Sequence, residues 1–249
     1  MLVLLPPSET KSVGGEAPPL AFDRLSWPEL TESRVRTARL LGQVSGKPRA
    51  GLTALGLTQG QSGELRQNLE LRTSATMPAI ERYTGVLYDA LDIRSLTAAQ
   101  RRTADARLAI GSALFGLIRA GDLIPAYRLS ASSRLPRVRS LSAMWRACVG
   151  PLLENLADEG IVVDLRSGAY QSLAPLPRAL TIRVVSEREG GMRAVVSHFN
   201  KASKGSIARE LAVASHEPRS AEEVAELLVG AGWDVEWRSA RQLDVVLQT

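Results

Sequence analysis

Basic side chains and glycines occur together in one central segment of this 249-residue sequence. Six arginines and one acid, Asp122, lie between Arg119 and Arg146, whereas the rest of the chain has 25 basic and 25 acidic side chains. The whole net charge of +5 therefore comes from this segment. A local positive field of this kind is suited to meet phosphate or another polyanion. Solvated arginines in a surface loop are the alternative.

The glycine-containing part of this segment is ALFGLIRAGDLIP, residues 113–125. We predict a short apolar helical turn, then a tight turn, and an apolar stretch that stops at Pro125. Glycines in such a hairpin let successive backbone N–H groups approach one phosphate, because no Cβ blocks the approach. Arginines nearby then fix the position of neighbouring phosphates without reading bases. The residues expected to bind DNA here are Gly116, Arg119, Gly121, Arg128 and Arg134. A turn in the core with its arginines in water is the alternative.

A second basic cluster is Lys201, Lys204 and Gly205 in SHFNKASKGSIAR, residues 197–209. We predict a helix over 201–214, which places these residues at its N-terminus. Cations oppose the helix dipole at that end, so their presence favours a phosphate or carboxylate ligand. His198 is expected to have a structural role.

The turn PPSETK, residues 6–11, directly follows a predicted buried strand over 2–5. Ligands gather at strand ends in open α/β sheets, so Ser8, Thr10 and Lys11 are candidates to hydrogen-bond an anion. A proline-rich turn with a Ser/Thr helix cap is the alternative. The sequence has neither of the usual glycine-rich nucleotide-binding motifs.

These groups allow a second functional hypothesis, an enzyme that acts on a phosphorylated or carboxylated small molecule. A lysine whose pKa is lowered by cationic neighbours could be a base or nucleophile, and a carboxylate could be a general acid or base. The residues expected to converge are Ser8, Lys11, Asp122, Tyr127, Arg128, Lys201 and Lys204. An enzyme requires an enclosed, ligand-sized cavity, whereas duplex DNA requires an open groove.

The composition limits other classes of function. The first apolar run stops at Pro6 with no basic region before it, so we expect no signal peptide or membrane span and a cytoplasmic protein. One cysteine, Cys148, excludes an internal disulfide. The two histidines, His198 and His216, match no metal-binding spacing, so we expect neither a metal nor a cofactor.

Hydrophobic periodicity predicts an α/β fold with a central mixed sheet surrounded by helices. Strands are expected at 2–5, 107–112, 161–165, on both sides of a turn over 189–191, and in two closing segments at 233–239 and 243–248. Helices are expected at 30–45, 62–72, 78–91, 97–106, 140–157, 201–214 and 220–230. We predict a single domain over 1–249, with an αββ tail over 216–249 packed on it.

Several motifs occur in the order found in the YaaA peroxide-stress protein family, which the whole chain resembles. The matching motifs are LLPPSETK, YTG, AIGSALFGLIRAGD, AYRL, a tryptophan on a helix (Trp145), LRSGAY and KASKG. The resemblance implies a cytosolic protein that helps cells survive hydrogen peroxide by keeping unincorporated iron low. It also implies an α/β fold with a positively charged cleft and a helix–hairpin–helix-like element that binds duplex DNA. Residues 112–125 would then correspond to that element.

The resemblance further implies that Arg128, Lys201 and Lys204 line the cleft. Three positions depart from the family pattern. Glu9 stands where the family turn has a lysine, Gly168 and Ala169 replace an acidic pair, and His198 replaces an aromatic residue. From the sequence we therefore expect a non-enzymatic protein that binds the phosphate backbone of duplex DNA. The second hypothesis, an enzyme that acts on a small anionic compound, remains the alternative.

Overall fold

A mixed β-sheet forms the centre of the structure, a computed structural model that describes residues 1–187, 193–194 and 197–248. In this described part, seven strands follow the order β4-β3-β1-β6-β7-β10-β9, and β8 pairs with β7. The strands are β1 (Leu2–Leu5), β3 (Leu108–Ser112), β4 (Gly116–Arg119), β6 (Val162–Asp164), β7 (Leu180–Glu187), β8 (Arg193–Ala194), β9 (Asp234–Ser239) and β10 (Gln242–Gln248). The predicted α/β class with a mixed sheet is confirmed.

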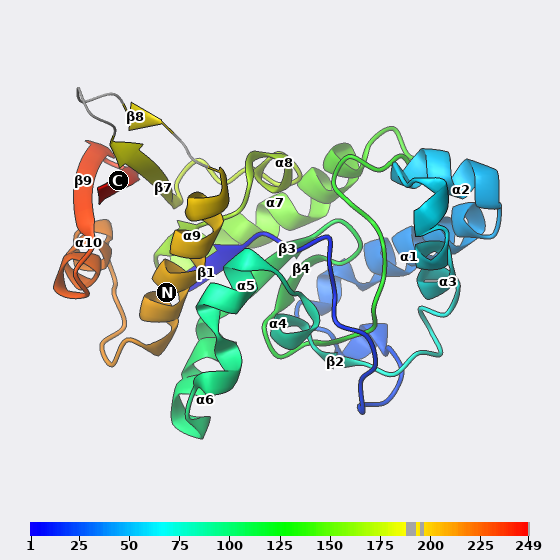
Figure 1. The fold of residues 1–249 in the computed structure, drawn as a ribbon, viewed down its shortest axis with the longest axis horizontal. Helices are drawn as coiled ribbons and strands as arrows, with labels where there is room; N and C mark the ends of the chain where they lie inside the picture. Colours follow the sequence, from blue (N-terminus) through cyan, green and yellow to red (C-terminus); the bar gives the residue numbers. More distant parts are fainter. Residues whose placement is uncertain (188–192, 195–196, 249) are drawn as a thin grey trace.

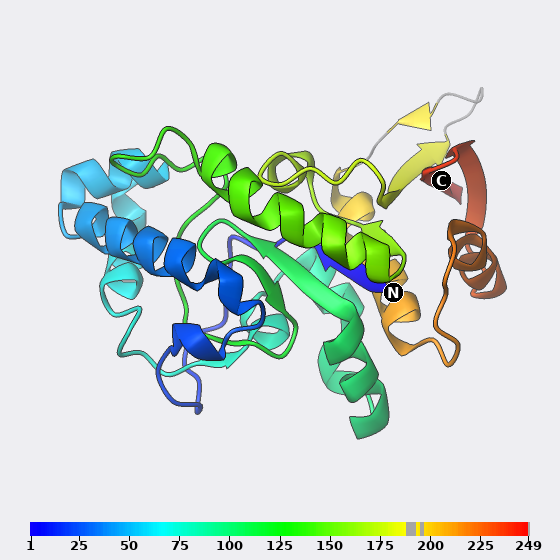
Figure 2. The same ribbon diagram turned by 180° about the vertical axis from the view of Figure 1, so that it is seen from behind.

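The central strands are buried and mostly apolar because helices cover both faces of the sheet. β1 pairs in parallel with β3 and β6, and all four of its residues are buried. Continuous apolar runs are typical of parallel strands that are covered on both sides. Helix α7 (Leu141–Glu159) crosses one face beside α1 (Thr31–Ser45), as Figure 2 shows. The opposite face carries α5 (Val86–Leu91), α6 (Ala98–Arg107) and α9 (Ser197–Val213) (Figure 1).

Shorter elements complete the fold around this sheet. They are α2 (Pro48–Leu55), α3 (Gly63–Leu69), α4 (Ala79–Arg82), α8 (Gly168–Gln171), α10 (Ala221–Gly230) and a small antiparallel sheet of β2 (Met77–Pro78) with β5 (Leu123–Ile124). Single 3-10 turns occur at Phe22–Arg24, Pro28–Leu30, Gln59–Gln61 and Ile93–Ser95. A capping box begins α6: Gln100 N donates to Thr97 Oγ1 at 3.3 Å, and Thr97 N donates to Gln100 Oε1 at 3.0 Å.

The predicted helix–hairpin–helix-like element at residues 112–125 is wrong. The segment forms the antiparallel hairpin of β3 and β4 and then β5. The amides of Leu114 and Phe115 donate to Ser112 Oγ at 3.2 and 3.1 Å, which closes the turn. Gly116 follows with φ +74°, a left-handed conformation that favours glycine. A short apolar run fits a strand as well as a helix, and the turn chemistry decided between them.

Two helix boundaries also differ from the prediction. The helix expected over 78–91 is divided into α4 and α5, because Gly85 adopts φ +102° and breaks the helix. Helix α9 begins at Ser197, four residues before the expected start. The turn predicted over 189–191 lies outside the described residues.

The C-terminal elements continue the main sheet. Both predicted closing strands are present: β10 pairs in parallel with β7 over seven residues, and β9 pairs with β10 in antiparallel orientation. Ser220 caps α10 by accepting a hydrogen bond from Glu223 N at 3.2 Å.

Among the described residues, none of the helices combines the length and the apolar character needed to cross a membrane.

Candidate anion-binding cavity

A cavity of about 920 Å³ lies where β1 and β6 end. Its walls come from the loop after β1 (residues 6–10), the residues that enter and begin α5 (84–88), the end of β6 with the segment that follows it (164–168), the start of β7 and the N-terminal half of α9. Crevices at the carboxyl ends of parallel strands are the usual ligand sites of open α/β sheets. The volume lies within the range of small-molecule sites.

Two lysines from α9 line this cavity. The chain has only four lysines against 27 arginines, and Lys201 and Lys204 lie three residues apart on the helix side that faces the cavity. Lys204 Nζ donates to Leu165 O at 3.2 Å, which leaves two of its three protons for another acceptor. Neither lysine forms an ion pair with a carboxylate in the described part of the chain. Burial lowers the pKa of Lys204, and the nearby carboxylate of Asp164 partly offsets this effect.

The other cations of the cavity already have carboxylate partners. Buried Arg166 donates from Nε and Nη2 to the two oxygens of Asp164, at 2.9 and 2.8 Å. Its Nη2 also donates to Ala174 O at 3.0 Å. Arg183 Nε lies 3.5 Å from Oδ1 of Asp244, its neighbour across the β7–β10 pair. Within the described part of the structure, the two lysines are therefore the cavity cations that lack a carboxylate partner and can hold an anion.

Hydroxyl groups form the wall across from α9. Thr10 Oγ1 donates to Thr84 O at 3.3 Å and lies 3.1 Å from Ser8 Oγ, which accepts from Thr10 N at 3.3 Å. Gly85 lies directly against these two hydroxyls, and its φ of +102° is a backbone conformation that favours glycine. Ser8 and Thr10 were predicted from the sequence, whereas Thr84 and Gly85 were not, although the YTG motif contains both.

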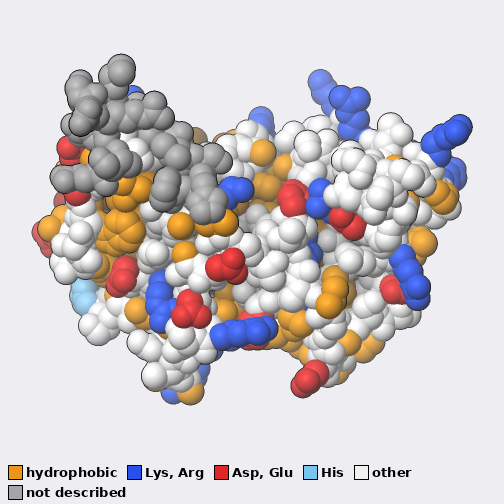
Figure 3. All heavy atoms as spheres, viewed as in Figure 1, with side chains coloured by type: hydrophobic (Ala, Val, Ile, Leu, Met, Phe, Trp, Pro, Cys, Tyr) orange, Lys and Arg blue, Asp and Glu red, His pale blue; other side chains and the backbone are white. Residues whose placement is uncertain are grey.

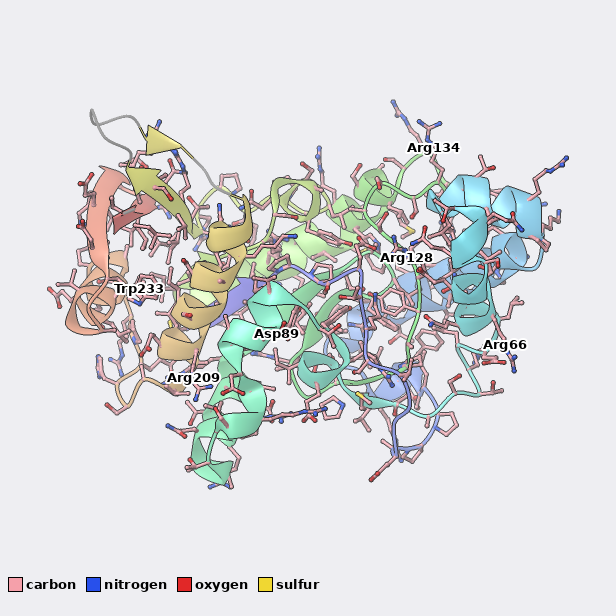
Figure 4. The ribbon with its side chains drawn as sticks, viewed as in Figure 1. Arg66, Asp89, Arg128, Arg134, Arg209 and Trp233 are labelled. Carbon is pink, nitrogen blue, oxygen red and sulfur yellow. The ribbon has the colours of Figure 1, made fainter. Side chains whose placement is uncertain are left out.

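Arg128 lies beside the cavity and holds the carboxylate at its rim. Its Nη1 is 3.3 Å from Glu9 Oε2, and its Nε is 3.2 Å from Glu64 Oε2. Figure 4 shows Arg128 in the interior between the loop after β1 and α3. Glu9 is half-exposed and lines the cavity. Arg128 is thus paired with two carboxylates and fixes Glu9 at the rim, and its binding of phosphate stays a prediction.

Lys11 supports the same loop from behind. Its Nζ lies 4.3 Å from the centre of the Tyr127 ring and 5.3 Å from that of Tyr83, and it donates to Ser8 O at 3.0 Å. Burial lowers its pKa to about 8, against the opposing attraction of Glu9. The phenol of Tyr127 bonds Tyr83 at 2.7 Å and Ser112 at 2.8 Å. Burial raises the pKa of Tyr127, so this phenol stays neutral.

Asp122 and Arg119, both predicted to act on a ligand, have structural roles elsewhere. Buried Asp122 accepts from Ser26 N at 3.1 Å, from Ser26 Oγ at 2.8 Å and from Arg119 N at 3.0 Å. The guanidinium of Arg119 lies 4.8 Å from the centre of the Trp27 ring and donates to Ala106 O. Asp122 therefore ties the turn after β4 to the loop before α1.

The three candidate glycines are also outside the cavity, and two of them are required by packing. A Cβ on Gly116 would lie 2.6 Å from the Trp145 ring, and one on Gly205 would lie 2.1 Å from Leu87 O. Gly205 thus allows α9 to pack closely on α5. Gly121 is exposed, and a Cβ there would lie 3.7 Å from the carboxylate carbon of Asp105. Packing thus accounts for Gly116 and Gly205, and the binding of phosphate by the three glycines stays a prediction.

The predicted residues therefore separate into two groups. Ser8, Lys201 and Lys204 line one cavity, with Lys11 and Arg128 next to it. Arg134 lies in another region, where it is exposed and points away from the molecule in Figure 4. On the face shown in Figure 3, acidic side chains are interspersed among the basic ones rather than excluded from a single basic stripe.

Comparison with known proteins places the chain in a family. The family model described as Peroxide stress protein YaaA matches residues 1–236. The chain belongs to this family. It is 47% identical over 251 residues to a UPF0246 protein of Corynebacterium efficiens, with 99% of each chain covered. It is 43% identical over 242 residues to a UPF0246 protein of Streptomyces coelicolor, with 95% of this chain and 92% of the relative covered. Membership of the YaaA family supports a role in peroxide stress.

Proposed function

We propose that this YaaA-family protein binds a small anionic compound, a phosphate ester or a carboxylate, in the cavity between α9 and the loop after β1. The observation that supports this most strongly is the pair Lys201 and Lys204, which line the cavity without an ion-paired carboxylate in the described part of the chain. The desolvation of Lys204 strengthens its interaction with a bound anion, because an ion pair is stronger in a medium of low dielectric constant.

The shape of the cavity supports a small ligand over a nucleic acid at this location. A volume of about 920 Å³ matches a compound of metabolite size. Duplex DNA would need a continuous run of phosphate-binding groups, and Arg166, Arg183 and Arg128 are each held by carboxylates. Among the described residues of the cavity wall, Lys201 and Lys204 are the cations without a carboxylate partner, and two such cations suit one phosphate or carboxylate group.

The proposal is tested by replacing the two lysines together with methionine, which keeps the length of the side chain. Calorimetric titration with inorganic phosphate and with ethyl phosphate should show a loss of affinity of at least about tenfold, because each charge-assisted hydrogen bond contributes about 1.5–3 kcal/mol. Lys47→Met is the matched control, since Lys47 is an exposed lysine at the start of α2, at the far end of the molecule. Equal affinity in the parent and the Lys201/Lys204 variant would exclude the cavity as the anion site.

Duplex DNA remains a second candidate ligand, at a different surface. Arg134, Arg137 and Arg139 are exposed on one loop before α7, and Arg36 borders a hollow of about 380 Å³ together with Arg137 and Arg139. None of these arginines pairs with a carboxylate in the described part of the structure. Exposed arginines of this kind bind phosphates without reading the base sequence.

The two candidate ligands are separated by crossing the variants. If the three loop arginines neutralise three phosphates, log K for a DNA duplex should fall with log salt with a slope of about −2.7. Replacing all three with glutamine should abolish that slope and leave phosphate affinity unchanged. The Lys201/Lys204 variant should show the opposite pattern. A DNA affinity that does not change with salt would contradict binding through the arginine loop.

A further inference from the structure

The two ends of the cavity offer opposite hydrogen-bonding groups. On the α9 side, Lys201 and Lys204 carry only donors. On the loop side, Glu9 carries only acceptors when ionised, and the hydroxyls of Ser8 and Thr10 lie beside it. Figure 1 shows α9 and the loop after β1 on different sides of the start of α5. A ligand that fills the cavity therefore meets donors at one end and a carboxylate with two hydroxyls at the other.

The hydroxyl hydrogens on the loop side are already used within the protein. Thr10 Oγ1 donates to Thr84 O, so in the contact of 3.1 Å between the two hydroxyls Ser8 is the donor and Thr10 the acceptor. Ser8 Oγ also accepts from Thr10 N at 3.3 Å. Each hydroxyl therefore has lone pairs but no hydrogen left for a ligand. The loop side accepts hydrogen bonds, and the ligand must supply the donors there.

The charges behind the loop decide between a neutral and a cationic donor. Glu9 Oε2 lies 3.3 Å from Arg128 Nη1, and Lys11 Nζ lies 3.4 Å from the backbone oxygen of Glu9. Glu64 also pairs with Arg128, so two carboxylates face the two protein cations and the charges behind the loop already balance. A ligand ammonium group would add a third positive charge beside them, whereas a hydroxyl group donates the same hydrogen bond without added charge.

The aromatic walls offer little surface for a nucleobase. Tyr88 and Tyr170 line the cavity, but each side chain is only 7% exposed, and Tyr88 donates its hydroxyl hydrogen to Pro6 O at 2.8 Å. Their rings are packed in the core, so little of either face is open for stacking. The apolar side chains of Pro7 and Ile182 border the same space and suit the C–H groups of a saturated compound.

From these contacts we infer that the ligand is a phosphorylated polyol such as a sugar phosphate, with its phosphate on Lys201 and Lys204 and its hydroxyl groups on the Glu9 side. This inference rests on the proposed anion site. It adds a prediction of its own, because Glu9 becomes the residue that selects for hydroxyl groups. The volume of about 920 Å³ leaves space beyond a single phosphate for the polyol chain or ring.

Three phosphate esters test the inference by titration of the full chain: ethyl phosphate, O-phosphoethanolamine and glucose 6-phosphate. All three present a phosphate monoester, and they differ in having no donor, an ammonium group or several hydroxyl groups. We expect glucose 6-phosphate to bind at least about tenfold more tightly than either of the others. Equal binding of the three esters, or tightest binding of phosphoethanolamine, would overturn the inference.

Glu9→Gln provides the second measurement, because it removes the charge and half of the acceptor capacity while keeping the shape. The preference for glucose 6-phosphate over ethyl phosphate should fall at least about fivefold, and the affinity for ethyl phosphate should stay within about twofold. Glu64→Gln is the matched control, since Glu64 also pairs with Arg128 but is not among the cavity walls. It should leave the preference unchanged. An unchanged preference in Glu9→Gln would contradict the role of Glu9.

The same titrations separate this inference from the proposed anion site. If the Lys201/Lys204 variant binds ethyl phosphate as the parent does, the anion site itself is wrong. If that variant loses ethyl phosphate while the parent shows no preference for the sugar ester, the anion site stands and the polyol assignment is wrong.

Discussion

Gly205→Ala is the substitution for which the structure makes the strongest prediction. The added Cβ would lie 2.1 Å from Leu87 O and 2.9 Å from Ala90 Cβ, and both atoms belong to α5. Backbone atoms cannot move aside as the end of a flexible side chain can, so α9 has to shift away from α5. Overpacking of this kind costs about 1–3 kcal/mol and sometimes more.

The net effect on stability follows from two opposing contributions. Alanine favours a helix over glycine by about 1 kcal/mol, which partly offsets the clash. A contact as short as 2.1 Å to a carbonyl oxygen places the clash at the upper end of the range, so we expect a net loss of about 2 kcal/mol or more. For a chain of this length that corresponds to a decrease in Tm of roughly 4–8 °C.

Urea denaturation and thermal melting followed by circular dichroism measure this loss. Gly42→Ala in α1 is the matched control, because a Cβ at that position meets nothing within 4 Å. It should raise stability by about 0.5–1 kcal/mol through helix propensity alone. If Gly205→Ala melts at the parent temperature or above it, the close packing of α9 on α5 is refuted, and with it the position of Lys204 at the cavity.

Two further predictions concern residues that the sequence analysis assigned to catalysis. Lys11 has a pKa of about 8 in the folded chain against 10.5 when unfolded, so between these values the unfolded state binds the additional proton. The stability of the parent relative to Lys11→Met should therefore be constant below pH 8 and rise between pH 8 and 10.5, by at most about 1.4 kcal/mol per pH unit. The free energy of unfolding of both proteins is measured by urea denaturation. If the difference between parent and Lys11→Met did not change across this pH range, Lys11 would be solvated in the folded chain. Asp122→Ala leaves the N–H and hydroxyl of Ser26 and the N–H of Arg119 without their acceptor, so the free energy of unfolding should fall by about 3 kcal/mol while phosphate affinity is unchanged. If Asp122→Ala instead lost phosphate affinity while its free energy of unfolding stayed at the parent value, Asp122 would belong to the ligand site.

Local patterns in the sequence predicted most of the elements. Contacts within a few residues determine the apolar run LVLL, the capping box at Thr97, the N-cap at Ser220 and the apolar stripe of α7. The segment 113–125 was the exception, because its apolar pattern suits either a helix or a strand. The hydroxyl of Ser112 and the left-handed backbone at Gly116 decided for a hairpin.

The candidate site was predicted only in part, because local patterns show which groups the chain carries but not how distant groups pair. Ser8 follows a strand, and the two lysines of α9 stand out in an arginine-rich chain, so their chemistry is visible in the order of residues. The pairing of Arg128 with Glu9 and Glu64 joins positions far apart in the chain, and composition does not reveal which cations are neutralised.

What the sequence determined by itself is therefore the class of fold, the family and the kinds of charged group that the chain carries, because periodicity, caps and motifs act over short distances. Only the tertiary structure decided which charges remain free. Arg119, Arg128 and Asp122 were matched with partners when distant segments came together, whereas Lys201 and Lys204 were left facing a cavity. The difference is physical, since the desolvation and pairing of a charge depend on every group packed around it.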